Sequence, residues 1–213
     1  MGEKIKIIIE IIKRGILEVI YPKDSKCILC QREDEEGICF MCRSKIKSCS
    51  DNEELCIGYY KGPLKELILK LKCKKDYVAG EVLVNLIEEK IANLDTKYYL
   101  TYIPSSDKSL KERGFNQCEY IAKELAFRNN FKVVNTLVMV REVKSQKTLS
   151  KEERFDNLYG TFQVRDSKLT EGRNFILIDD VVTTGATLAE GIRALKENGA
   201  EEIKILTLAK SHI

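Results

Sequence analysis

Apolar and polar positions along this chain follow two different periods. Short runs of consecutive apolar residues are typical of strands that are buried on both faces. These runs lie at 98–103, 131–140, 174–178 and 203–208. Elsewhere apolar residues recur every three or four positions, which predicts helices. The predicted helices cover 76–94, 108–129 and 188–198, with another that begins near Pro63. Strands that alternate with helices predict an α/β fold with a mostly parallel sheet flanked by helices.

The most informative segment joins the apolar run at 174–178 to the helix that follows it. Asp179 and Asp180 end the run, and the small, hydroxyl-rich loop Thr183, Thr184, Gly185, Ala186 and Thr187 precedes the helix. Ligands of open parallel sheets bind at the carboxyl ends of the strands, where such a loop and a helix N-terminus can hold a phosphate. Two adjacent acids can hold sugar hydroxyls or a hydrated Mg²⁺. The alternative is an ordinary strand that ends in a solvated acid pair and a capped helix.

Two further segments point to the same edge of the sheet. Ser105 and Ser106 follow the run at 98–103, and such a turn suits a second anion, although it also suits a plain strand-to-helix connection. In the next helix Gly114 follows Arg113, and a helical glycine costs about 1 kcal/mol relative to alanine. We therefore expect a bend or a close backbone approach there. Arg113 can clamp a phosphate or carboxylate with two parallel hydrogen bonds.

Residues 141–172 are polar and charged, and we interpret them as a long loop or hairpin. Its cations are Arg141, Lys144, Lys147, Lys151 and Arg154. A segment of this length inside a compact domain is usually functional or disordered, so we expect it either to close over the ligand or to be a solvated run of charges.

Four of the eight cysteines form two closely spaced pairs, which predicts a structural zinc site. The pairs are Cys27 with Cys30, and Cys39 with Cys42. Two such pairs can place four thiolates around Zn²⁺, and metal binding would supply folding energy to a module with little core of its own. The alternatives are four unrelated thiols or a redox dithiol. Cys49 and Cys56 could exchange as ligands, whereas Cys73 and Cys118 fit buried positions in helices.

Composition limits the class of protein. The chain has 213 residues, of which 36 are basic and 33 acidic, so any basic surface must be local. Charged residues interrupt the Ile-rich start, which predicts an amphipathic helix over 3–20. We therefore expect a cytoplasmic protein without a transmembrane segment. A peripheral contact of this helix with a membrane is the weaker alternative. We therefore divide the chain into an N-terminal helix (1–21), a four-cysteine zinc module (22–56) and a larger α/β domain (57–213).

The segment from Asp179 to Thr187 resembles the phosphoribosyl pyrophosphate (PRPP) signature of type I phosphoribosyltransferases. The resemblance implies that Asp179 and Asp180 bind the ribose hydroxyls and that Thr183–Thr187 hold the 5′-phosphate, with Mg²⁺ as cofactor. It also implies that the turn at Ser105 and Ser106 contacts the pyrophosphate. Transferases that act on 6-oxopurines have an Asp where this chain has Thr183, and a threonine cannot act as a base near neutral pH.

The order of all these motifs resembles the ComF family. The resemblance rests on the four cysteines, Tyr60–Leu64, Arg113–Gln117 and Asp179–Thr187. It implies a type I phosphoribosyltransferase-like parallel sheet with an N-terminal zinc module. It also implies a role in natural transformation, with single-stranded DNA and a helicase-like protein as partners.

Two functions remain open from the sequence. The chain could be a phosphoribosyltransferase that transfers the pentosyl group of Mg-PRPP to a nitrogen nucleophile in nucleotide salvage, with Asp179, Asp180 and Arg113 as its catalytic residues. It could instead be a binding module, in which a PRPP-type site serves as a sensor or binds the phosphates of single-stranded DNA. Local cations for a DNA track are available at Lys70, Lys72, Lys74 and Lys75, together with the loop at 141–154.

Overall fold

A five-stranded parallel sheet forms the centre of the molecule. The computed structural model describes residues 25–33, 35–49, 55–141 and 157–211, together with residues 12, 15 and 16. The strands run in the order β1 (Leu55–Tyr59), β7 (Ile203–Lys210), β6 (Phe175–Val182), β2 (Tyr99–Tyr102) and β3 (Lys132–Val133). All neighbouring pairs are parallel, which confirms the predicted α/β class.

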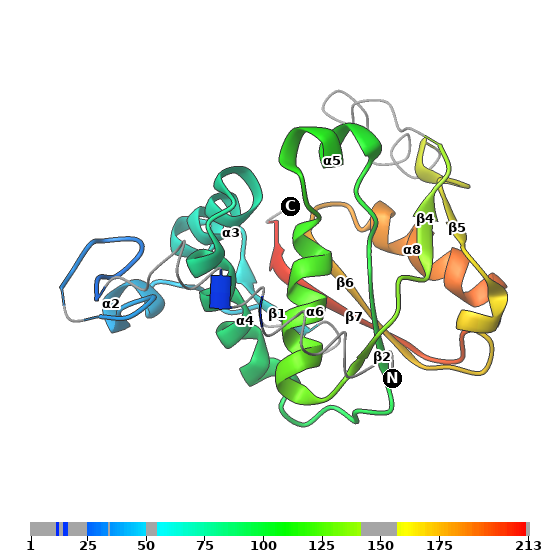
Figure 1. Cartoon of the computed structure of the whole chain (residues 1–213), viewed down its shortest axis with the longest axis horizontal. Helices are drawn as coiled ribbons and strands as arrows, with labels where there is room; N and C mark the ends of the chain where they lie inside the picture. The colour runs from blue at the N-terminus through cyan, green and yellow to red at the C-terminus, as the bar shows by residue number, and fades with distance from the viewer. Residues whose placement is uncertain are drawn as a thin grey trace.

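Helices cover both faces of this sheet (Figure 1). One face carries α3 (Gly62–Lys74), α4 (Tyr77–Ile91) and α6 (Gln117–Asn129), and the other carries α8 (Ala186–Glu197). Beside α8 lies an antiparallel hairpin of β4 (Leu137–Met139) and β5 (Phe162–Val164). The short elements are α2 (Phe40–Arg43), α5 (Asp107–Arg113) and the 3₁₀ turn η2 (Ser167–Leu169).

The core has two parts, one on each side of the sheet. Because successive side chains of a strand point to opposite faces, Ile176 and Ile178 of β6 pack towards α4 and α6, whereas Phe175 and Leu177 pack towards α8. Leu100 of β2 is fully buried in the first part. This alternation continues to the end of β6 and decides where the acid pair points.

Two expected elements differ from the observed ones. The run at 131–140 is not one strand: β3 pairs with β2, and the chain then leaves the sheet at Asn135 and Thr136 to form β4 of the hairpin. Polar residues in the middle of the run allow this crossing, and the Thr136 hydroxyl hydrogen-bonds the Thr101 hydroxyl at 2.7 Å. The run at 174–178 continues as a strand to Val182, because β7 pairs with it along this whole length.

The predicted helix over 108–129 is divided into α5 and α6 at the glycine singled out above. Gly114 ends α5 with a φ of +75°, in the left-handed region that favours glycine. Asn116 then begins α6, where its side-chain oxygen accepts from the N–H groups of Cys118 and Glu119. The expected bend is confirmed.

The Cys-rich segment lies at one end of the molecule, beyond α3 and α4, with α2 within it (Figure 1). Its chain then runs beside the sheet, where the Tyr59 N–H of the edge strand β1 donates to the Lys47 carbonyl at 2.9 Å. The boundary drawn at 56/57 falls inside β1, which begins at Leu55. The sequence 55–59 follows a polar, Cys-rich stretch, and only its pairing with β7 identifies it as a strand.

Two other expectations concern residues that the structure does not describe. The helix over 3–20 and the cations from Lys144 to Arg154 lie outside the described residues. Of the segment 141–172, which we interpreted as a long loop or hairpin, β5 belongs to a hairpin, but its partner strand β4 precedes the segment. In the part of the chain that the structure covers, no helix has the length and apolar character that crossing a membrane requires.

Candidate ligand site at the carboxyl edge of the sheet

A cavity of about 440 Å³ lies where β2 and β6 end. The turn after β2 contributes Ser105 and Ser106, and α5 and α6 contribute Arg113 and Gln117. The remaining walls come from β6, α8, α3 and the hairpin, with Asp179, Thr187, Lys72, Met139, Leu158 and Phe162 among the lining residues. Segments far apart in the sequence therefore meet at one polar cavity with an apolar wall.

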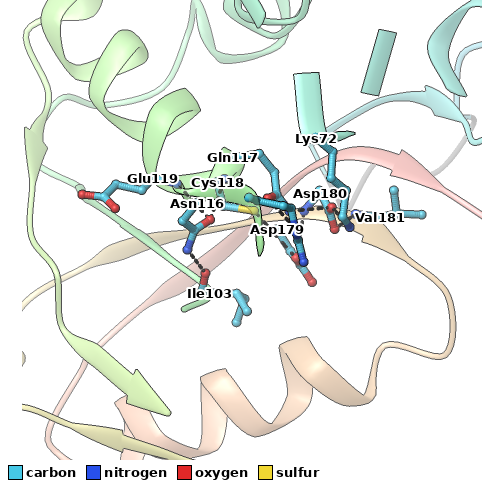
Figure 2. A network of polar contacts seen from close by, with 10 residues as sticks. Lys72, Ile103, Asn116, Gln117, Cys118, Glu119, Asp179, Asp180 and Val181 are labelled. Carbon is cyan, nitrogen blue, oxygen red and sulfur yellow. Dashed lines mark hydrogen bonds and ion pairs between the residues drawn. The ribbon is translucent and has the colours of Figure 1, made fainter. Parts of the chain in front are cut away.

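The two acids of β6 point in opposite directions because they are consecutive residues of a strand. Asp179 lines the cavity, and its Oδ1 lies 3.9 Å from the Cys118 Sγ. Asp180 faces α3 and α6, where its Oδ2 accepts from Lys72 Nζ at 2.5 Å and from Gln117 Nε2 at 2.7 Å (Figure 2). Only Asp179 of the pair is therefore presented directly to the cavity.

Burial controls the ionisation of this pair. Both residues are buried, each with 8% of its surface exposed. Burial, and next the nearby Asp180 carboxylate, raises the pKa of Asp179 to about 8. Burial lowers the pKa of Lys72, but its ion pair with Asp180 outweighs burial, so that the pKa is raised overall. Burial therefore favours the protonated form of Asp179, which lies beside the Lys72–Asp180 ion pair.

The turn after β2 is held by the helix that follows it. The Ser106 hydroxyl caps α5 by accepting from the Ser109 N–H at 3.2 Å. Asn116 Nδ2 donates to the carbonyl of Ile103 at 2.9 Å, which ties the start of α6 to the end of β2 (Figure 2). Arg113 Nη1 donates to Gln117 Oε1 at 3.0 Å, and Gln117 in turn donates to Asp180. One chain of hydrogen bonds therefore links Arg113 to the acid pair.

The loop between β6 and α8 has the geometry of a tight turn before a helix. Gly185 occupies the N-cap of α8 with a φ of +79°, and the Ala186 N–H donates to the Thr184 Oγ1 at 3.5 Å. Among the described residues that line the cavity, Thr187 is the one from this loop. The four residues that precede Thr187 in the chain are not part of the cavity lining; they are Thr183, Thr184, Gly185 and Ala186.

The four paired cysteines form a separate cluster. The Sγ atoms of Cys27, Cys30, Cys39 and Cys42 all lie within 4.8 Å of one another. Four thiolates bound to one Zn²⁺ at about 2.3 Å would have sulfur–sulfur separations of roughly 3.8 Å, close to this arrangement. The cluster is compatible with a bound metal. Cys49 and Cys56 lie apart from it as a second pair, with Sγ atoms 2.9 Å apart.

The thiols of the cluster differ in their acidity. Burial raises the pKa of Cys27, but backbone N–H groups around its sulfur outweigh burial and lower the pKa to about 6. Burial, together with hydrogen bonds to the other three thiols, raises the pKa of Cys42 to about 12. Once one thiol is ionised, its negative charge therefore disfavours ionisation of the other three. A cation at the centre of the cluster would remove this repulsion.

The structure adds residues that the sequence reasoning did not place in the site. Lys72 was grouped with other lysines of α3, but it alone of these is directed at Asp180. In the sequence Lys72 directly follows Leu71 of the apolar stripe of this helix. Nothing in the sequence identifies its partner Asp180, which lies 108 residues away. Cys118 is buried as expected and also lines the cavity, whereas Cys73 is exposed, contrary to expectation, because it lies on the outer face of α3.

Comparisons with known proteins agree with this architecture. Residues 110–213 match the family model of the phosphoribosyl transferase domain. Competence protein F of Haemophilus influenzae is 27% identical over 93% of this chain and 95% of its own length. Competence protein ComFC of Bacillus subtilis is 28% identical, over 83% of this chain and 85% of that protein. DNA utilization protein YhgH of Salmonella typhimurium is 27% identical, over 73% of this chain and 70% of that protein.

Among solved structures, adenine phosphoribosyltransferase from Thermoanaerobacter pseudethanolicus aligns with 64% of this chain and 83% of that chain, at 14% identity and a TM-score of 0.43. The matched residues run from the end of α5 to β7, and the similarity to Competence protein F extends over 93% of the chain. The chain is thus a ComF-like protein: it contains a phosphoribosyltransferase-like domain and is similar over most of its length to the competence proteins F and ComFC.

Proposed function

We propose that the chain binds PRPP, or a closely related phosphorylated ribose, in the cavity at the carboxyl edge of the sheet. One observation carries the proposal: a carboxyl group from β6, cations from α3 and α5, and serines from the β2 turn line a single cavity. Its volume of about 440 Å³ is in the usual range for small-molecule sites.

Each part of the ligand has candidate partners. Asp179 and Asp180 would bind the ribose hydroxyls, and their carboxylate oxygens suit the hydrated Mg²⁺ that accompanies such ligands. The segment Thr183–Thr187 would hold the 5′-phosphate, with free N–H groups and the positive dipole end of α8. Arg113, Ser105 and Ser106 would contact the pyrophosphate, since a guanidinium and hydroxyls suit its oxygens. Asp179, Thr187, Arg113, Ser105 and Ser106 line the cavity, whereas Asp180 and residues 183–186 lie outside its lining.

Calorimetry with PRPP and Mg²⁺ tests the proposal. The double variant Asp179→Asn, Asp180→Asn removes both carboxylates while keeping their size, and we expect it to lose binding. Asp107→Asn, which removes an exposed carboxylate in the first turn of α5, is the matched control and should bind as the native chain does. If the zinc-loaded native chain binds no PRPP, the proposal fails.

Arg113 has a test of its own. Arg113→Gln should weaken PRPP at least tenfold but leave ribose 5-phosphate binding close to native, because ribose 5-phosphate has no pyrophosphate. Equal losses for the two ligands would show that Arg113 supports the fold of the site through Gln117 and does not contact the pyrophosphate.

We also propose that the Cys cluster holds a structural Zn²⁺. All four sulfurs are needed for a tetrahedral thiolate site, which leaves no position for a substrate. Three of the four cysteines are buried, and each pair is joined by a tight turn, which supports a closed site. Zinc bound there would stabilise the segment that packs beside β1.

The relatives named for competence and for DNA utilization support a role in the uptake or use of DNA. We propose that single-stranded DNA contacts the cations near the cavity mouth. Lys74 and Lys75 are exposed at the end of α3, and Lys75 Nζ lies 3.0 Å from the position that a side chain on Gly114 would take. The cations of α3 therefore continue to the turn after Arg113.

Salt-dependent binding of a fluorescent oligonucleotide tests this role. Lys74→Glu with Lys75→Glu should weaken binding and reduce its salt dependence. Lys97→Glu with Lys132→Glu makes the same change in charge at the opposite edge of the sheet and should have little effect. Equal effects of both pairs would indicate a general charge effect and no local track.

A second candidate is pentosyl transfer from PRPP to a nitrogen nucleophile. The apolar wall of Met139, Leu158 and Phe162 favours it, because a nucleobase needs an apolar face beside the ribose. Pyrophosphate release in the presence of nucleobases, ammonia or glutamine is the measurement. Binding of PRPP without release under any of these conditions would reject transfer and retain the binding role.

A further inference from the structure

The acid pair has a cation from outside the part of the chain that matches the phosphoribosyl transferase domain. Lys72 belongs to α3, whereas the match begins at residue 110. Four apolar residues fix α3 on the core: Leu64, Leu67, Ile68 and Leu71 are all buried. This packing directs Lys72 at Asp180. The neighbouring lysines differ: Lys70 Nζ lies 3.9 Å from Asp76 Oδ2, and Lys74 is exposed.

The carboxylate of Asp180 already has three donors. Its Oδ1 accepts from the Val181 N–H at 2.8 Å, and its Oδ2 accepts from Gln117 and Lys72. The side chain of Asp180 is only 11% exposed, so there is little room for a fourth partner. A metal ion or a sugar hydroxyl that approaches Asp180 must therefore replace one of these donors.

Of the three donors, Lys72 is the one that can leave. The Val181 N–H is part of the backbone of β6. Gln117 is buried at the start of α6 and is held by Arg113 through its other side-chain atom. Lys72 is 32% exposed and has a flexible four-carbon stem, so its ammonium group can move into solvent without disturbing the fold.

We propose that Lys72 is the resident cation of Asp180, which keeps divalent metal off the acid pair until a phosphorylated ligand arrives and draws the lysine away. The proposal deepens the proposed function and rests on it, because it assigns Lys72 a positioning role at the same acids. An anionic ligand supplies the exchange partner: the ammonium group can move from the carboxylate to a phosphate oxygen, while the carboxylates turn to metal and ribose. In this structure Asp180 and Lys72 form an ion pair with each other.

Metal binding by the ligand-free chain is the test, with Mn²⁺ as the probe. Mn²⁺ favours carboxylate and water ligands over thiolates, so the zinc-loaded Cys cluster should not compete for it. Free Mn²⁺ is measured by electron paramagnetic resonance during a titration of the full chain. Lys72→Met and Lys72→Gln should each bind Mn²⁺ at least tenfold more tightly than the native chain does.

Matched variants separate this role from general effects of charge. Lys72→Arg keeps a cation near Asp180 and should bind Mn²⁺ as weakly as the native chain. Lys65→Met removes an exposed lysine of the same helix and should also leave Mn²⁺ binding unchanged. Combining Lys72→Met with Asp180→Asn should abolish the gain, which places the new metal at the acid pair.

The outcomes are distinct. If Lys72→Met does not fold, Lys72→Gln, whose amide can still donate to Asp180, carries the test. Equal Mn²⁺ affinity in the native chain and in the folded Lys72 variants would overturn the proposal, as would a gain that persists without Asp180. No PRPP is present in this titration. The Mn²⁺ result can therefore be interpreted even if the chain proves not to bind PRPP.

Discussion

Replacing Asp179 by Asn should change how the stability of the protein depends on pH. The folded chain raises the pKa of Asp179 from 3.8 to about 8, because the carboxyl group is buried next to Asp180. In the unfolded chain the group returns to its ordinary pKa. Between these two values the folded state therefore holds one more proton than the unfolded state.

The sign and size of the effect follow from this difference. The stabilising contribution is fully present below about pH 4 and is lost as the pH rises towards about 8. One proton changes the free energy of unfolding by at most about 1.4 kcal/mol per pH unit. Asparagine has no proton to lose, so the variant lacks this slope.

Urea unfolding of the zinc-loaded native chain and of Asp179→Asn, at a series of pH values across this window, measures the effect. The difference in unfolding free energy, native minus variant, should decrease steadily with rising pH. Titration of the thiols occurs in both proteins and cancels in the difference. Asp107→Asn, which removes an exposed carboxylate, is the control. A difference that is constant with pH would refute the argument that burial keeps Asp179 protonated.

Three further changes have definite expected outcomes. Cys39→Ser should lose bound zinc, measured as metal equivalents by mass spectrometry, while Cys73→Ser should keep it; a full equivalent in Cys39→Ser would contradict the four-cysteine site. Gly58→Ala should destabilise the fold by about 1–3 kcal/mol in urea, because its Cβ would clash with the backbone carbonyl oxygen of Lys47; an unchanged midpoint would show that the segment beside β1 can shift. Gly114→Ala should destabilise by about 1–2 kcal/mol, since its φ is +75°, and a smaller loss would mean that the turn after α5 adopts another conformation.

Local patterns predicted most of the fold correctly. Consecutive apolar residues identified the central strands, and apolar spacing identified α3, α4, α6 and α8. These signals are reliable because burial between two layers of helices imposes them directly on the sequence. β1 and the division of 131–140 were not predicted, because both depend on which distant strand offers a hydrogen-bonding edge.

The candidate site divides in the same way. The sequence by itself determined the chemistry that is available: an acid pair at a strand end, a hydroxyl-rich turn before a helix, a glycine that breaks a helix after Arg113, and four paired cysteines. Only the tertiary structure decided how that chemistry is used. The pleat of β6 turns Asp179 to the cavity and Asp180 to α3, and the packing of α3 brings Lys72 to Asp180 across 108 residues of sequence. The reason is physical: residue types and spacings record local requirements, whereas the direction of a side chain and its charge partner depend on how distant elements pack.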